Sequence, residues 1–94
     1  MPFYVYILAN TDDNRLYKGF TENPSIRLQQ HNNKESSFTS TKSGWYFVCV
    51  IEFDNKKEGL IFEKKIKRWN RSSIENLIYS KRNIADKFLN NSVC

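Results

Sequence analysis

Four side chains in this sequence have types that could act together on a charged substrate: Tyr17, Arg27, His31 and Glu63. Arg27 and His31 are four residues apart, so on a helix they project from one face and present two donors suited to a phosphate. Glu63 lies three residues before Ile66, on the flank of an apolar helical stripe. A partly buried carboxylate at such a position needs a cation, a donor or a metal ion to offset its lost hydration.

Each of these residues, taken singly, is more often structural than catalytic. A strand tyrosine such as Tyr6 or Tyr17 usually packs in the core, and a lone helix arginine is usually solvated. A lone histidine is most often at the surface or satisfied in a core. Glu63 alone would most often pair with Lys67, four residues on. Only the combination of these residues favours a functional site.

The elements that must position these side chains begin with a predicted hairpin. Residues 3–9 and 15–21 have strand character, and the intervening NTDDN is dense in turn-forming residues. Asn23 followed by Pro24 is a strong helix start, because Asn caps free N–H groups and Pro suits the first helical position. We therefore expect a helix over residues 24–32, followed by a polar surface loop.

The second half of the chain predicts one strand and then helices. Residues 45–53 are almost continuously apolar, which indicates a central core strand covered on both faces. A helix is expected over residues 57–69, and Ser72 with Glu75 matches a capping box that starts the next helix. A last short helix is expected around Ile84 and Phe88, with a frayed NNSVC tail.

Length and charge limit the classes of function. The 94 residues have room for a single domain, and 39% hydrophobic residues make a compact core feasible. The net charge of +5 favours a nucleic acid or another polyanionic partner. Part of this charge is a basic cluster, which is either a solvated helix face or a contact with a nucleic-acid backbone: Lys64, Lys65, Lys67, Arg68 and Arg71.

The cysteines and the N-terminal segment favour a cytoplasmic protein. Cys49 and Cys94 have no ligand-like spacing, so we expect free thiols in a reducing compartment. The apolar run after Met1 is too short for a signal peptide or a membrane span, and no basic residue precedes it. We expect no association with a membrane.

In this order of elements, the sequence resembles the GIY-YIG nuclease superfamily, and in particular its small bacterial members. Five segments carry the resemblance: YVYIL at 4–8, LYKGFT at 16–21, NPSIRLQQHN at 23–32, FTSTKSGWYFVCVIEF at 38–53 and EGLIFEKKIKRWNR at 58–71. Tyr4 stands where the first motif has glycine, and Lys18 replaces an apolar residue of the second. The paired lysines usual in small members are absent near Ser73 and Ile74. The resemblance covers about residues 3–78, and the order and spacing of the segments make it specific.

The resemblance implies an α+β fold with a small three-stranded antiparallel sheet flanked by helices, in the order β-β-α-β-α-α. It implies one domain over residues 1–94, with its core at about 3–78 and a C-terminal helical tail at 79–94.

The resemblance also implies roles for individual side chains. Arg27 would bind the scissile phosphate, and Tyr17 would be a general base toward water, with Tyr6 orienting the water or the phosphate. His31 would donate to the phosphate or relay a proton. Glu63 would hold one Mg²⁺ or Mn²⁺ ion, since hard cations prefer carboxylate oxygen.

The expected activity is therefore a divalent-metal-dependent DNA endonuclease that acts in repair or on structured DNA. The residues expected to contact nucleic acid are Lys18, Lys42, Lys64, Lys67, Arg68 and Arg71. The alternatives are a non-catalytic nucleic-acid-binding module on the same fold and, least favoured, a protein-interaction domain. Because the nuclease fold uses the whole chain, specificity must be weak, based on shape or supplied by a protein partner. The sequence leaves the oligomeric state open.

Overall fold

The computed structural model describes residues 2–11, 15–33 and 44–89, and its order of strands and helices follows the expected one. The elements are β1 (Phe3–Asn10), β2 (Leu16–Thr21), α1 (Pro24–Asn32), β3 (Trp45–Phe53), α2 (Lys56–Ile66), α3 (Arg71–Ile78) and α4 (Asp86–Leu89). The strands form one antiparallel sheet in the order β2-β1-β3. The α+β fold with a three-stranded antiparallel sheet and flanking helices is therefore confirmed.

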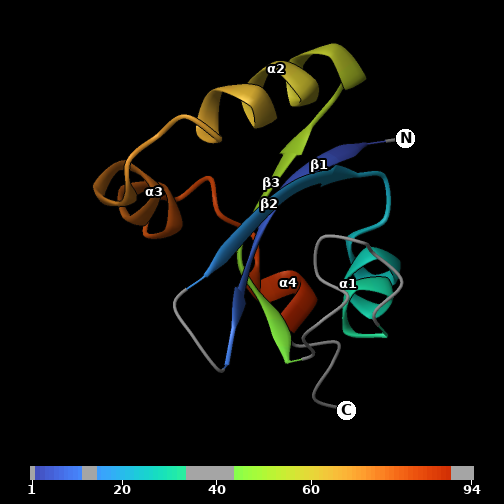
Figure 1. The fold of residues 1–94 in the computed structure, drawn as a ribbon. Coiled ribbons are helices and arrows are strands. Elements are labelled where there is room, and N and C mark those ends of the chain that lie inside the picture. Colours follow the sequence, from blue (N-terminus) through green and yellow to red (C-terminus); the bar gives the residue numbers. More distant parts are fainter. Residues whose placement is uncertain (1, 12–14, 34–43, 90–94) are drawn as a thin grey trace.

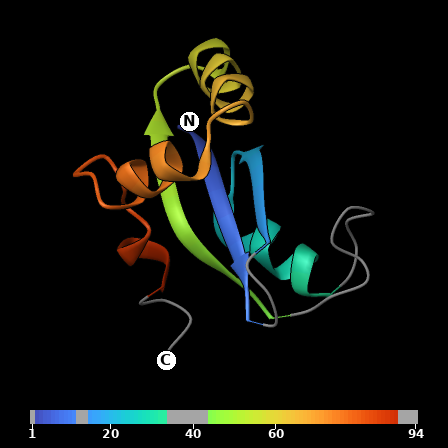
Figure 2. The ribbon, with the colours of Figure 1, turned by 60° about the vertical axis from the view of Figure 1, so that its left-hand side comes forward.

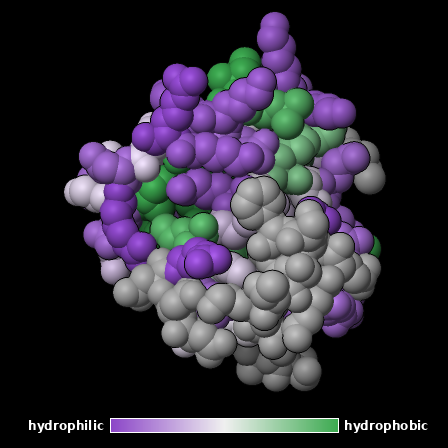
Figure 3. Space-filling view, viewed as in Figure 1, coloured by the Kyte–Doolittle hydropathy of each residue, from purple (hydrophilic) through white to green (hydrophobic). Residues whose placement is uncertain are grey.

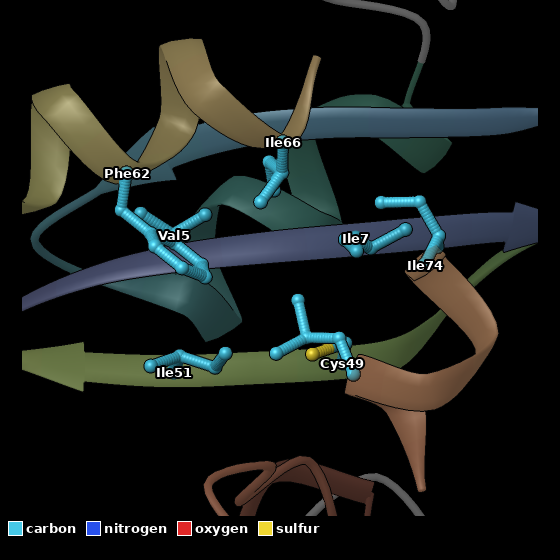
Figure 4. Close-up of a cluster of buried hydrophobic side chains, with 8 residues drawn as sticks. Val5, Ile7, Cys49, Ile51, Phe62, Ile66 and Ile74 are labelled. Carbon is cyan, nitrogen blue, oxygen red and sulfur yellow. The ribbon is translucent and has the colours of Figure 1, made fainter. Parts of the chain in front are cut away.

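The sheet separates two clusters of buried side chains. One face of the sheet packs against α2 and α3 through aliphatic residues such as Val5, Ile7 and Ile66 (Figure 4). The other face packs against α1 and α4 through an aromatic-rich cluster that includes Tyr6 and Phe47. Figures 1 and 2 show the sheet between these helices. Alternation along β1 feeds both clusters, because successive strand residues point to opposite faces.

The expected central position of residues 45–53 in the sheet is wrong, because β1 is the central strand and β3 lies at an edge. Residues after α3 cover that edge. The side chain of Asn83 accepts from Val50 N at 3.0 Å and donates to Val48 O at 2.8 Å, while Ile84 N donates to Val50 O at 2.8 Å. This cover supplies part of the pairing that an edge strand lacks. Side chains of β3 contribute to both buried clusters, so cover on both faces is found as expected along its middle, whereas Tyr46 and Glu52 are exposed.

Two helix boundaries also differ from the expected ones. The helix predicted over 57–69 ends at Ile66, and Trp69 lies beyond it. The next helix is capped by the Asn70 side chain, which accepts from Ser73 N at 2.9 Å, so the capping box at Ser72 is wrong. Asn is as good a cap as Ser, and it stands two residues earlier.

Residues beyond 78 add to the core on the α1 side. Ala85 is buried, and Ile84 and Phe88 pack against the aromatic-rich cluster. The NNSVC tail lies outside the described residues, as does the loop over 34–43. In the part of the chain that is described, no helix combines the length and the apolar character needed to cross a membrane.

Candidate active site

The Tyr6 hydroxyl is the point at which the predicted site residues meet. Tyr6 comes from the central strand β1 and is 1% exposed. Its oxygen lies 2.9 Å from His31 Nε2 and accepts from Arg27 Nε at 3.3 Å. Arg27 and His31 lie 21 and 25 residues after Tyr6 in the chain, and the Tyr6 oxygen contacts both.

Helix α1 places the side chains of Arg27 and His31 beside this oxygen, because capping fixes the residue at which the helix begins. The Asn23 side chain accepts from Ile26 N at 3.2 Å, and Pro24 occupies the first turn. From that start, positions 27 and 31 lie one turn apart on the same face. The expected shared face of Arg27 and His31 is therefore confirmed, and this face points toward β1.

Tyr17 completes an aromatic group around His31. It lies on β2, and its ring centroid is 4.7 Å from that of His31 and 6.2 Å from that of Tyr6. Tyr17 is partly exposed, whereas Tyr6 and His31 are buried. Of the three rings, Tyr17 is the one that a substrate or a water molecule can reach.

Gly19 makes room for the Tyr6 ring, and it was not among the predicted site residues. It pairs with Tyr6 across β1 and β2, and a Cβ atom at this position would lie 2.5 Å from Tyr6 Cζ. A side chain there would push the hydroxyl away from its two partners. A glycine inside a strand often marks a close approach of this kind, so the sequence did carry a signal.

Gln30 is a second residue that sequence reasoning missed. Its Oε1 accepts from Arg27 Nη1 at 2.9 Å, while Arg27 Nε is bound to Tyr6. Two contacts on different nitrogens fix both the position and the plane of the guanidinium. The sequence signal was the spacing of three residues on one helix, which is common and therefore weak.

Burial decides the charge states at the centre of the site. Burial raises the pKa of Tyr6 to about 12, opposed by the hydrogen bond from Arg27. Burial, followed by the positive charge of Arg27, lowers the pKa of His31 to about 4. The hydrogen bond to Tyr6 is the main cause that raises the pKa of Arg27. At neutral pH the site therefore holds a neutral phenol at Tyr6, a neutral imidazole and a guanidinium cation.

Glu63 lies on α2, which packs against the face of the sheet opposite to the Tyr6 cluster. Its side chain is 15% exposed, and Oε2 lies 3.1 Å from Lys67 Nζ, so the ordinary pairing considered for it does form. Its negative charge also contributes, as the smallest of several causes, to the raised pKa of Tyr6. Glu63 thus lies within electrostatic range of Tyr6.

The donor set fits one hard cation held by a single protein carboxylate. Within the described residues, no group of three or more His, Cys, Asp or Glu side chains could hold a metal ion. Mg²⁺ keeps several of its waters and binds through one or two carboxylates together with substrate phosphates. The half-buried Glu63 fits this mode of binding, and Lys67 is exposed enough to move aside.

The residues expected to contact nucleic acid do not form one patch. Lys64, Lys67 and Arg68 line a shallow hollow at the end of α2 together with Ile61 and Trp69. Arg71 and Lys18 lie elsewhere. Arg71 lies on α3 in a different hollow. Lys18 follows Tyr17 on β2, so its side chain points to the face of the sheet opposite to that of Tyr17. Lys42 is outside the described residues.

Comparison with known proteins shows which family this chain is similar to. The model of the GIY-YIG catalytic domain matches residues 2–83. A UPF0213 protein of Staphylococcus haemolyticus is 36% identical over 69 residues, which cover 72% of this chain and 83% of that protein. The structure-specific endonuclease subunit SLX1 homolog of Brugia malayi is 38% identical over 71 residues, which cover 65% of this chain and 21% of that protein.

A solved structure agrees with the fold. The solution NMR structure of a UPF0213 protein from Bacillus halodurans is 29% identical, with a TM-score of 0.56 and 87% of each chain covered. The family model spans every element that contributes to the group around Tyr6, from β1 through α2. This small protein therefore belongs to the GIY-YIG family.

Proposed function

We propose that this protein is a divalent-metal-dependent endonuclease that hydrolyses phosphodiester bonds in DNA. The observation that carries the proposal is the group around the Tyr6 hydroxyl, where Arg27, His31 and Tyr17 meet in a chain that matches a catalytic-domain family. The net charge of +5 supports a polyanionic substrate. The Brugia malayi relative is named a structure-specific endonuclease subunit, which supports structured DNA as the substrate, and we extend the proposal to a role in repair.

Arg27 binds the scissile phosphate in this proposal. Its planar guanidinium suits two-point contact with phosphate oxygens and offsets the negative charge of the transition state. The contacts with Tyr6 and Gln30 hold it in place before the substrate arrives. Such preorganisation lowers the activation barrier because the group does not need to reorient during the reaction.

The two tyrosines take different roles because their surroundings differ. Tyr17 is partly exposed, so its phenolate, with its own proton released to solvent, can take a proton from an attacking water molecule. Tyr6 is buried, and its raised pKa keeps it protonated, so it positions Arg27 and does not act as a base. His31 is 0% exposed and neutral, so we assign it to holding the Tyr6 hydroxyl instead of contacting phosphate.

Glu63 would hold one Mg²⁺ or Mn²⁺ ion. When bound, such an ion supplies charge neutralisation at the phosphate and at the leaving oxygen. The carboxylate must leave Lys67 to do so, which a contact with an exposed lysine allows at small cost.

In this proposal the protein is a single domain that acts in the cytoplasm. The free thiol of the buried Cys49 accords with a reducing compartment. A protein partner would supply specificity beyond the shape of the DNA.

A cleavage assay tests the proposal. Purified protein is incubated with labelled single-stranded, duplex, nicked, flapped and branched DNA, with Mg²⁺, Mn²⁺ or EDTA, beside Glu63→Ala. We expect metal-dependent nicking by the native protein and DNA binding without nicking by the variant.

The ion pair between Glu63 and Lys67 favours a second candidate, a DNA-binding module without activity. In such a module Glu63 would form an ion pair with Lys67 and would not bind a metal ion. Equal binding by both proteins with no cleavage under any condition would favour this module.

A further inference from the structure

A second hollow lies on the face of the sheet opposite to Tyr6, between α3 and the strands. It encloses about 580 Å³ and is lined by Ala9, Asn10, Thr11, Leu16, Tyr46, Val48, Arg71, Glu75, Ile78 and Tyr79. Its floor is a row across the three strands, because Ala9 pairs with Leu16 on one side and with Tyr46 on the other. The small side chain of Ala9 in the middle of this row makes the sheet surface concave. In Figure 3, hydrophobic side chains are visible in this region, between α3 and β2.

The rim of the hollow carries two aromatic rings that the core does not use. Tyr46 is 42% exposed and Tyr79 is 88% exposed, and they belong to the few large hydrophobic residues that face solvent in the described chain. Arg71 and Glu75 stand on α3 beside them, with Nε and Oε2 3.7 Å apart and both side chains exposed. The hollow therefore offers exposed rings, an apolar floor, a cation and a hydrogen-bond acceptor.

These groups match the chemistry of a nucleotide with an unstacked base. Aromatic side chains stack on bases, and an arginine nearby binds phosphate or adds a cation–π contact. The Glu75 carboxylate can accept from an exocyclic amine of the base. A peptide partner would use the apolar floor as well, but it would gain less from Arg71 at the rim.

The hollow is close to the proposed catalytic group through the thickness of the sheet. Leu16 lines the hollow, and Tyr17, the next residue, faces the catalytic group. β2 is an edge strand, so a nucleic-acid strand can pass around it from one face to the other. Lys18 lies on the same face as Leu16, where a phosphate on this path would find a cation.

We propose that this hollow binds an unpaired base of the DNA substrate, stacked on the exposed rings of Tyr46 and Tyr79, a few nucleotides from the scissile phosphate. The inference rests on the proposed function, since it takes DNA as the substrate. It assigns a preference for DNA with a single-stranded segment to a site on the face opposite to Tyr6, Arg27 and His31.

The test measures binding without cleavage. Fluorescence anisotropy in EDTA gives the Kd of the native protein for a labelled flapped DNA and for a fully paired duplex. The same measurements are made on Tyr46→Ala/Tyr79→Ala and on the matched control Tyr46→Phe/Tyr79→Phe, which keeps both rings. Both tyrosines are exposed, so the variants should fold, and far-UV circular dichroism checks this.

We expect the alanine variant to bind flapped DNA at least tenfold more weakly, as loss of base stacking does. It should bind duplex as the native protein does, and the phenylalanine control should bind both DNAs normally. A 2-aminopurine base in the flap should lose fluorescence with the native protein and the control but not with the alanine variant.

Unchanged binding of flapped DNA by the alanine variant would overturn the inference. So would a loss of affinity for duplex DNA as large as the loss for flapped DNA. In either case, metal-dependent cleavage by the native protein would leave the proposed function standing. A native protein that neither binds nor cuts any DNA would remove the proposed function and this inference together.

Discussion

The two faces of the sheet differ in what they bury. On the α2 and α3 side, the buried cluster is mostly aliphatic, with Val5, Ile7 and Ile66 at its centre. On the α1 side, Tyr6 and His31 are buried and hydrogen-bonded to each other, and the Tyr6 hydroxyl also accepts from Arg27. Residues 5, 6 and 7 of one strand serve both faces in turn. One face supplies stability by hydrophobic burial, while the other holds polar groups in a fixed geometry, which suits catalysis.

This division predicts that shortening a buried side chain on the aliphatic face lowers the free energy of unfolding and leaves the cleavage rate of the folded protein unchanged. Ile66→Ala should lower the free energy of unfolding by about 2–5 kcal/mol, because a fully buried side chain leaves a cavity. Urea unfolding measures this change. The cleavage rate per folded molecule should match that of the native protein, and a large loss of that rate would break the division.

The polar face predicts a pH dependence of stability that the aliphatic face lacks. His31 has a pKa of about 4 when folded, against about 6.5 when unfolded. Between these values the unfolded chain binds more protons, so the free energy of unfolding should rise with pH. The part due to His31 should be complete above about pH 6.5 and lost as the pH falls to about 4, amounting to at most about 3 kcal/mol.

The matched control is His31→Gln, whose amide can still reach the Tyr6 hydroxyl but does not titrate. Its unfolding free energy should change less than that of the native protein over the same pH range. Identical pH profiles of the two proteins would contradict a buried neutral imidazole at this position.

A smaller effect is expected at Gln30, which touches Arg27 but not Tyr6. Gln30→Ala removes one of the contacts that orient the guanidinium, so the single-turnover cleavage rate should fall about tenfold. Gln30→Glu keeps an acceptor and should retain most of the rate. Gln29→Ala, a neighbouring exposed position, serves as the control. Equal rates for Gln30→Ala and the native protein would reduce Gln30 to a surface residue.

Local signals in the sequence predicted most of the framework. Asn23 and Pro24 marked the start of α1, and this start set the shared face of Arg27 and His31. The apolar run over 45–53 marked β3 correctly but not its place at the edge, because pairing order depends on contacts distant in sequence. The cover that Asn83 provides for β3 has no local signature. Asn70 and not Ser72 caps α3, and cap preference could not decide between them because Asn and Ser are comparable caps.

The residues of the candidate site were predictable, but their environments were not. The resemblance of the motifs identified Tyr6, Tyr17, Arg27 and His31, and the structure brings them together. That His31 has no exposed surface and is neutral follows from packing around it, which spacing does not reveal. Gly19 and Gln30 act through contacts with Tyr6 and Arg27, so they emerge only in three dimensions.

The cleavage rate of Arg27→Ala tests the central claim most directly. The rate is measured in single turnover on flapped DNA with Mg²⁺, beside Arg27→Lys and the native protein, and each protein's unfolding free energy is measured in urea. We expect Arg27→Ala to cut about a thousandfold more slowly with little loss of stability, and Arg27→Lys to restore only a small part of the rate. An Arg27→Ala protein that is folded and cuts as fast as the native protein would contradict the claim that catalysis resides on the polar face of the sheet.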